Sequence, residues 1–251
     1  MADRILVIAP HPDDESIGCG GAICLHGRRG DHVGLVFLTS GEMGLSHLAA
    51  EAARATREAE AKAAAEVLGV EHLEFLRLPD MGLLAHLNRG ARSLREIIAR
   101  DAPDVIYLPH PEEVHPDHAA AWPMIRGALG RGEGRGGPPR LRAYEVWTPL
   151  PWYDRLEDIT PVVGQKLGAI RCHRSQIVAI RHDHAARALG RYRGAMAGCR
   201  YAEVFRDLPH TALADAARGL VRYWRNPARL RRLRRLLACR RRWAAFRGER
   251  V

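Results

Sequence analysis

The chain has 251 residues, of which 47% are hydrophobic and 27% are charged, as in a globular protein with one sizeable core. No run of about 18 apolar residues occurs, so the sequence predicts no transmembrane helix. The first residues lack a basic segment followed by an apolar one, so no secretory signal is expected. These features argue against a disordered, coiled-coil or integral membrane protein.

The cysteines are odd in number and scattered, without a CxxC pair, at positions Cys19, Cys24, Cys172, Cys199 and Cys239. This usage is typical of a reducing compartment, so we expect a cytoplasmic protein without structural disulfides. Cys19 and Cys24 stand near the polar motif described below, and metal ligation by them is one interpretation. Small buried thiols on a helix are the favoured one.

Charge is distributed unevenly along the chain. The formal net charge is +10, but residues 211–251 contain 13 arginines and 2 acidic residues, which leaves the remainder at −1. In this tail, Leu230, Leu233 and Leu237 have the spacing of one helix face. We therefore expect a nearly neutral body over 1–210 and a basic helical tail over 211–251.

Three roles for this tail stay open. It can pack on the body or on a second subunit, or it can lie on an anionic membrane surface as a basic amphipathic helix. Nucleic-acid binding is the least favoured role, because no motif that reads a groove is present.

Hydrophobic patterning predicts alternating strands and helices. Apolar, β-branched runs predict strands at 4–9, 33–39, 72–76, 104–108 and 141–147. Helical composition and spacing predict helices at 16–26, 51–68, 93–100, 119–129, 165–171 and 184–196. A loop rich in Gly, Arg and Pro is expected at 130–139. The alternation is typical of parallel βαβ units, and hence of an α/β protein with a mostly parallel sheet and helices on both faces.

Unusual polar residues follow two of these strands, at 11–15 and at 110–118. In open α/β sheets the ligand site lies beyond the carboxyl ends of the strands. Taken alone, the first loop is as well explained by a turn with an Asx cap as by a metal site, and the second as well by the start of a helix. Their occurrence together at strand ends favours a shared functional site.

The two loops offer ligands suited to a metal ion, because His11-Pro12-Asp13-Asp14 and His115-Pro116-Asp117-His118 supply three histidines and three aspartates. A catalytic zinc needs about three protein ligands and an open position. His11 and Asp14 can reach one ion from a tight turn, and a histidine of the second loop would complete the set. Asp13 would then stand where a general base is needed.

At this point the sequence resembles the LmbE-like or PIG-L-type de-N-acetylases. The likeness rests on the two motifs above, on Gly18-Cys19-Gly20-Gly21 after the first, and on several markers in the expected order. Those markers are Thr39-Ser40-Gly41-Glu42, Arg57 with Glu60, Leu78-Pro79-Asp80, His173-Arg174-Ser175-Gln176 and Glu203-Val204-Phe205. The resemblance spans roughly residues 4–206 and implies a Rossmann-like fold; the tail lies outside it.

The resemblance implies a zinc ion held by His11, Asp14 and His118, with Asp13 as general base. It also implies that His115 protonates the leaving amine or stabilises the oxyanion, and that Asp117 hydrogen-bonds a histidine. Nearby carboxylates are expected to favour the cationic form of His115. Fe²⁺, Co²⁺ or Mn²⁺ could replace zinc, because N/O ligands discriminate weakly between these ions.

For the substrate, the resemblance implies contact of Arg57 with sugar hydroxyls and, by motif position, places Glu42, Asp80 and His173 at the substrate. His182-Asp183-His184 looks like a second ligand cluster, but a solvated turn or cap is the favoured interpretation. Hexamers are familiar in the family, so a homo-oligomer is an expectation of the resemblance, although the sequence shows none.

The leading hypothesis is thus a zinc-dependent hydrolase that removes acetyl from an N-acetylglucosamine-type sugar, either a small molecule or a lipid-linked conjugate. Paired acid and base roles predict a bell-shaped pH profile. A competing hypothesis is a non-catalytic scaffold whose tail binds an anionic membrane or nucleic acid, but the intact ligand set argues against it. A phosphoesterase is a third hypothesis, disfavoured because ligands for only one ion are evident.

Overall fold

A single sheet of seven strands organises the protein. The structure is a computed structural model, and it describes residues 2–70, 72–130 and 137–209. The strand order is β3-β2-β1-β4-β5-β7-β6. The strands are β1 (Arg4–Ala9), β2 (His32–Phe37), β3 (His72–Phe75), β4 (Val105–Pro109), β5 (Arg140–Tyr144), β6 (Arg155–Asp158) and β7 (Ala202–Leu208). The first five are parallel, whereas β7 runs antiparallel to both β5 and β6.

Side-chain alternation along β1 shows why helices cover both faces of the sheet. Val7 and Ala9 belong to one buried apolar cluster, and Leu6 and Ile8 belong to the other. Because successive side chains of a strand point to opposite faces, a continuous apolar run requires apolar partners on both sides.

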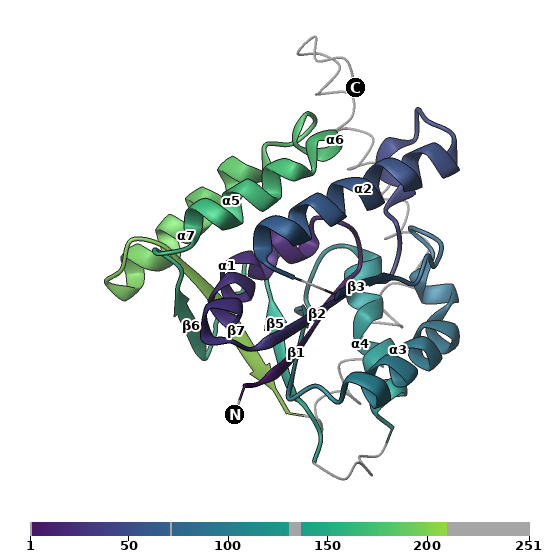
Figure 1. Ribbon diagram of the computed structural model, residues 1–251, viewed down its shortest axis with the longest axis horizontal. Helices are drawn as coiled ribbons and strands as arrows, with labels where there is room; N and C mark the ends of the chain where they lie inside the picture. Colours follow the sequence, from purple (N-terminus) through teal and green to yellow (C-terminus); the bar gives the residue numbers. More distant parts are fainter. Residues whose placement is uncertain (1, 71, 131–136, 210–251) are drawn as a thin grey trace.

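The helices supply those partners in two layers (Figure 1). One layer contains α1 (Asp14–Arg29), α2 (Ala50–Leu68), α5 (Val163–Cys172) and α7 (His182–Ala197), with the short α6 (Arg174–Ile177) between the last two. The other contains α3 (Leu87–Asp101) and α4 (Pro116–Leu129), and two 3₁₀ turns, η1 (Glu42–Leu45) and η2 (Leu83–Ala85), lie in the connections. The predicted α/β, Rossmann-like architecture is confirmed.

The antiparallel edge is the part of the sheet that the patterning did not predict. In β7, Glu203 and Arg206 interrupt the apolar run, yet both are buried. Glu203 accepts hydrogen bonds from the backbone N–H groups of Gly21 and Ala22, both at 2.8 Å, and pairs with Lys166 at 2.5 Å. The polar residues of β7 are typical of an exposed segment when read in the sequence. In the folded protein, tertiary partners satisfy them.

Some predicted boundaries shift. Helix α1 begins at Asp14 rather than at residue 16, α3 begins at Leu87 rather than at 93, and β5 ends at Tyr144 rather than at 147. Most of the predicted loop at 130–139 and the basic tail at 211–251 lie outside the described residues. Within the described part of the chain, no helix is long and apolar enough to cross a membrane.

Candidate metal centre

The first polar motif forms the turn between β1 and α1. Asp14 is the first residue of α1, and its Oδ2 atom accepts a hydrogen bond from the backbone N–H of His11 at 2.8 Å. The same oxygen lies 3.2 Å from Nδ1 of His11 and 3.2 Å from Nε2 of His118. Two residues of one loop and one of another therefore meet at a single carboxylate oxygen.

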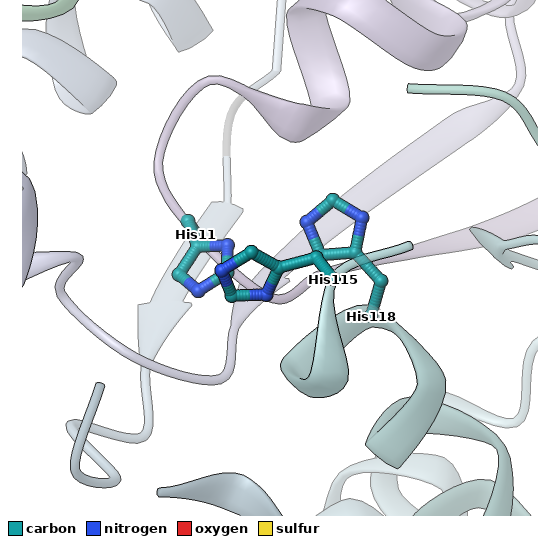
Figure 2. A group of neighbouring side chains, drawn as sticks. All are labelled: His11, His115 and His118. Carbon is teal, nitrogen blue, oxygen red and sulfur yellow. The ribbon is translucent and has the colours of Figure 1, made fainter. Parts of the chain in front are cut away.

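The second motif opens helix α4. His115 caps the helix, because its Nδ1 accepts the backbone N–H of Asp117 at 3.2 Å, and Pro116 occupies the first helical position. This start places His115 and His118 on the same turn. Figure 2 shows their rings gathered with that of His11, and the ring centroids of His11 lie 4.7 Å and 5.3 Å from those of His115 and His118. Pairing of β1 with β4 brings the two loops together.

Two further carboxylates stand behind the His11 ring. Nε2 of His11 lies 3.2 Å from Oδ1 of Asp80 and 3.3 Å from Oδ2 of Asp117. Asp117 also accepts the backbone N–H groups of Met81 and Leu83 at 2.7 Å and 3.1 Å. Carboxylates in this position hold a proton on Nε2, so Nδ1, which faces Asp14 Oδ2, is the ring nitrogen suited to act as a ligand. The predicted hydrogen bond between Asp117 and a histidine is present.

Charge interactions dominate the protonation of this cluster. Burial alone would raise the pKa of Asp14, but His118 and His11 outweigh it and hold that pKa well below its usual range. Burial likewise opposes the charge of His118, but Asp14 and Glu113 raise its pKa to about 9. A deprotonated carboxylate flanked by nitrogen donors is the electronic environment in which a divalent cation replaces protons.

The donor set fits a metal ion. Asp14 Oδ1 and His118 Nε2 are both buried and make no hydrogen bond within the described residues. The 3.2 Å separations match the edge of a tetrahedron about 3.3 Å long that ligands of zinc define. Such buried polar atoms are costly unless another partner satisfies them, and an ion between the three side chains would do so.

Two other groupings are also compact enough to hold an ion. The ring nitrogens of His11, His115 and His118 lie within 4.8 Å of one another, as do ligand atoms of His11, Asp80 and Asp117. We favour the set with Asp14. The carboxylates of Asp80 and Asp117 already accept backbone N–H groups, whereas Asp14 keeps one oxygen free.

Asp13 stands beside this set in an unusual backbone conformation. Its φ is 116°, in the left-handed region that few residues other than glycine adopt, and its backbone N–H donates to Glu15 Oε2 at 3.0 Å. Its Oδ2 lies 3.3 Å from Nη2 of Arg57. Burial raises the pKa of Asp13, and the Arg57 charge opposes that rise. The carboxyl group is therefore able to exchange a proton.

Arg57 is buried at 3% exposure, and its guanidinium is enclosed by the protein. It donates to the carbonyl of Gly41 at 3.3 Å and to that of Pro12. A Cβ atom at Gly41, where φ is +63°, would lie 2.8 Å from Cζ of Arg57, and one at Gly44 would lie 2.5 Å from Nη1. The two glycines thus permit the close approach that holds Arg57 against Asp13.

The other predicted substrate residues lie close by, and they differ in how many of their polar atoms already have partners within the protein. Glu42 Oε1 accepts the backbone N–H of Asp80 at 3.3 Å, and Glu42 Oε2 makes no hydrogen bond within the described chain. Both oxygens of Asp80 are engaged, with His11 and with the backbone N–H of Met43 at 2.8 Å. His173 is fully buried, and its Nε2 lies 3.2 Å from Glu15 Oε1. Among Glu42, Asp80 and Arg57, the carboxylate of Glu42 keeps an oxygen, the buried Oε2, without a hydrogen-bond partner in the described chain.

The protonation expected for His115 differs from what the structure shows. Burial, together with the nearby His11 and His118, lowers the pKa of His115 well below its usual range. The neutral imidazole accepts from the backbone at Nδ1, so its proton resides on Nε2. The expectation of a cationic His115 was wrong, because burial and the approach of two other histidines outweigh the carboxylates.

One aromatic residue borders the centre without having been singled out by motif, and one acidic residue that was singled out lies in another environment than expected. The ring of Trp147, in the segment after β5, has its centroid 6.0 Å from that of His115 and 6.3 Å from that of His182. Asp183, expected in a solvated turn or cap, is instead buried against Arg171 and Arg181. An aromatic residue at the carboxyl end of the predicted strand 141–147 was the available signal for Trp147.

Comparison with known proteins agrees with this geometry. Residues 6–129 match the PIG-L family, described as GlcNAc-PI de-N-acetylase. The chain is 30% identical over 230 residues to diacetylchitobiose deacetylase of Thermococcus kodakarensis, covering 82% of this chain and 83% of that protein. The structure of N,N'-diacetylchitobiose deacetylase from Pyrococcus horikoshii has a TM-score of 0.73 at 28% identity, over 84% of this chain and 85% of that one.

One similar structure has a different reaction in its title. The 4-carboxy-2-hydroxymuconate hydratase of Pseudomonas putida has a TM-score of 0.70 at 25% identity, over 82% of this chain and 96% of that one. The fold is therefore shared by enzymes of more than one class.

The fold and its His–His–Asp cluster define an α/β protein with a site that fits a metal ion at the switch between β1 and β4. The chain belongs to the PIG-L, or LmbE-like, family. Its homologues include deacetylases of N-acetylglucosamine-type substrates.

Proposed function

We propose that the protein is a metal-dependent hydrolase that removes the acetyl group from an N-acetylglucosamine-type sugar or glycoconjugate. The observation that carries this proposal is the meeting of His11 Nδ1 and His118 Nε2 at Asp14 Oδ2, each at 3.2 Å, beside the buried carboxyl of Asp13. His11, Asp14 and His118 would hold the ion. Zinc is the first choice, and Fe²⁺, Co²⁺ or Mn²⁺ are alternatives.

A divalent ion bound here would supply Lewis acidity, which lowers the pKa of water and polarises a carbonyl group. Asp13 accepts the proton that the attacking water loses as its oxygen bonds to the acetyl carbon. Arg57 holds the Asp13 carboxylate in place, with Oδ2 and Nη2 3.3 Å apart. When the C–N bond breaks, Asp13 returns this proton to the leaving amine nitrogen, so acetate and a free amine result.

His115 acts as a neutral imidazole and stabilises the intermediate through a hydrogen bond. Its Nε2–H donates a hydrogen bond to the oxygen that becomes negative as water adds to the carbonyl. This assignment follows from the lowered pKa of His115 and from the backbone N–H of Asp117 that occupies Nδ1. Of the two roles expected from the resemblance, oxyanion stabilisation is the one that the protonation state favours.

Substrate hydroxyl groups have an acceptor nearby in Glu42, whose Oε2 is free of protein partners within the described residues. We propose that Glu42 binds a sugar hydroxyl. In the same proposal, Asp80 supports His11 and His173 supports Glu15, because each of these side chains is engaged within the protein. Arg57 would contact a sugar hydroxyl from the position in which it also holds the Asp13 carboxylate.

The test combines metal analysis with a substrate panel. The purified protein is loaded with zinc, and free amine is measured with N-acetylglucosamine, diacetylchitobiose, and thiol- and lipid-linked glucosaminides. One metal per chain and amine release from at least one compound are expected. Bound metal with hydration of an unsaturated carboxylic acid, and no amine release, would instead favour the hydratase chemistry of the similar structure. Failure to bind metal would contradict the proposal.

The tail and the location of the protein are further parts of this proposal. Residues 211–251 carry a charge of +11, and we propose that they bring a cytoplasmic enzyme to the inner membrane surface. Sedimentation with anionic liposomes should fall when these residues are deleted and should persist in the full chain. Equal sedimentation of both proteins would contradict a membrane role. An assembly of identical subunits also stays a prediction, which the mass in solution tests.

A further inference from the structure

Glu113 is a buried carboxylate that the proposed chemistry does not use. It lies in the loop between β4 and α4, with 2% of its surface exposed. Its Oε1 atom accepts three consecutive backbone N–H groups, from Val146, Trp147 and Thr148, at 2.8, 2.9 and 3.2 Å. One oxygen therefore anchors the segment that carries Trp147 at the border of the centre.

The second oxygen of Glu113 faces the metal centre. Oε2 lies 3.6 Å from Nδ1 of His118, which is too long for a hydrogen bond, and neither atom has a hydrogen-bond partner within the described residues. Both side chains have no exposed surface. Two orphan polar atoms of opposite character thus face each other inside the protein, where each is costly without a partner.

We propose that Glu113 is a positioning residue that holds His118 in the tautomer with its proton on Nδ1. Nε2 then presents its lone pair toward Asp14 Oδ2, 3.2 Å away, where the ion is proposed to bind. A metal-bound histidine ordinarily donates its other ring N–H to a carboxylate or carbonyl, which fixes both tautomer and ring orientation. This inference rests on the proposed metal site and adds a residue that no motif assigned.

The arrangement also couples two parts of the site. Because Oε1 is committed to three backbone N–H groups, the Glu113 carboxylate cannot rotate without releasing the segment with Trp147. His118 and this segment are therefore held by one rigid group. A purely structural interpretation, in which Glu113 only anchors the segment, must be separated from the positioning role.

The variant Glu113→Gln separates the positioning role of Glu113 from a purely structural role as an anchor. Its amide oxygen has to face the three backbone N–H groups, since an amide NH₂ cannot accept them, so the anchor is retained. The NH₂ group then faces His118 and donates to Nδ1. The His118 proton moves to Nε2, and the lone pair that would bind the metal is lost. The matched control is Glu112→Gln, because Glu112 is half-exposed and pairs with His110 and Arg206 away from the ion.

The measurement is the affinity for zinc alone, determined by competition with a chromophoric chelator on the full-length, metal-stripped chain. Thermal unfolding of the stripped proteins checks that each variant is folded. We expect Glu113→Gln to bind zinc about 10- to 100-fold more weakly than the wild type. Glu112→Gln should stay within about threefold. An affinity of Glu113→Gln within threefold of the wild type overturns the proposal.

A second measurement needs no variant at position 113 and decides the matter if that variant does not fold. In ¹⁵N-histidine-labelled, zinc-loaded wild type, the His118 signals are assigned by comparison with His118→Gln. Protonated Nδ1 with metal on Nε2 is the expected state, and the reverse tautomer contradicts the proposal. If the wild type binds no zinc in either experiment, the proposed function itself fails, which is a distinct outcome.

Discussion

Oδ2 of Asp14 lies 3.2 Å from Nε2 of His118, although the two residues stand in different loops and follow different strands. The parallel pairing of β1 with β4 creates this proximity. Neither Nε2 of His118 nor Oδ1 of Asp14 has a hydrogen-bond partner within the described chain. The two side chains thus pair with each other and still keep buried polar atoms that the proposed cation would satisfy.

Replacing Asp14 by Asn should abolish tight metal binding. The amide oxygen can still accept the backbone N–H of His11, so the turn is preserved, but the negative charge is gone. We expect a loss of zinc affinity of about 100-fold or more, since even supporting residues cost 10- to 100-fold. Metal content after dialysis is the measurement, and Asp104→Asn, at the opposite end of β4, is the control. Equal metal content in Asp14→Asn and wild type would contradict the ligand role.

Replacing Asp13 by Asn should separate chemistry from metal binding. Asparagine tolerates the left-handed conformation at φ 116°, so the fold is expected to survive. Loss of the proton acceptor should lower kcat by about 10² to 10⁴-fold with little change in KM. Zinc stoichiometry should stay at the wild-type value. Activity of Asp13→Asn within threefold of the wild type would rule out a general base at this position.

The different burial of two tryptophans predicts different costs of replacing them. Trp122 of α4 is fully buried, and its Nε1 donates to the carbonyl of Pro109 at 2.7 Å, whereas Trp152 is 56% exposed. Trp122→Ala should lower the free energy of unfolding by about 3–5 kcal/mol. Trp152→Ala should cost about 1 kcal/mol or less, because it removes only a cation–π contact with Arg206. Urea denaturation checks both; similar costs would contradict the described burial.

Stability should depend on pH through His26, which lies at the other end of α1. Its Nδ1 is 2.7 Å from Asp31 Oδ2, and its Nε2 is 2.9 Å from the Tyr107 hydroxyl. Burial lowers the pKa of His26 below its usual range, with Asp31 opposing. Below about pH 6.5, His26 therefore becomes protonated in the unfolded chain while it stays neutral in the folded protein. The free energy of unfolding thus falls as the pH falls toward the lowered pKa.

The measurement is the free energy of unfolding at pH 7.5 and 5.5 for wild type and His26→Gln, both zinc-loaded. The wild type should lose more stability between these pH values than the variant does. Because all other histidines are common to both proteins, the difference reports His26. A larger loss in the variant would reverse the sign and refute the argument.

The sequence alone determined the fold class and the location of the site. Alternating apolar strands and amphipathic helices require parallel βαβ units, and polar loops after two strands place a ligand site at their carboxyl ends. His11 and Asp14 share one turn, so their cooperation followed from spacing. The edge strand β7 was not predicted, because Glu203 and Arg206 break its apolar pattern and find their partners only in the folded chain.

Tertiary structure decided how each side chain acts. Strand order brings His118 to Asp14. The segment after β3 brings Asp80 to the His11 ring, and the backbone N–H of Leu83 holds Asp117 beside the same ring. The low pKa of His115 and the direction in which Glu113 points depend on burial and on neighbours distant in sequence. Spacing along a chain sets which residues can meet, but protonation and ligand geometry depend on distances that only packing creates.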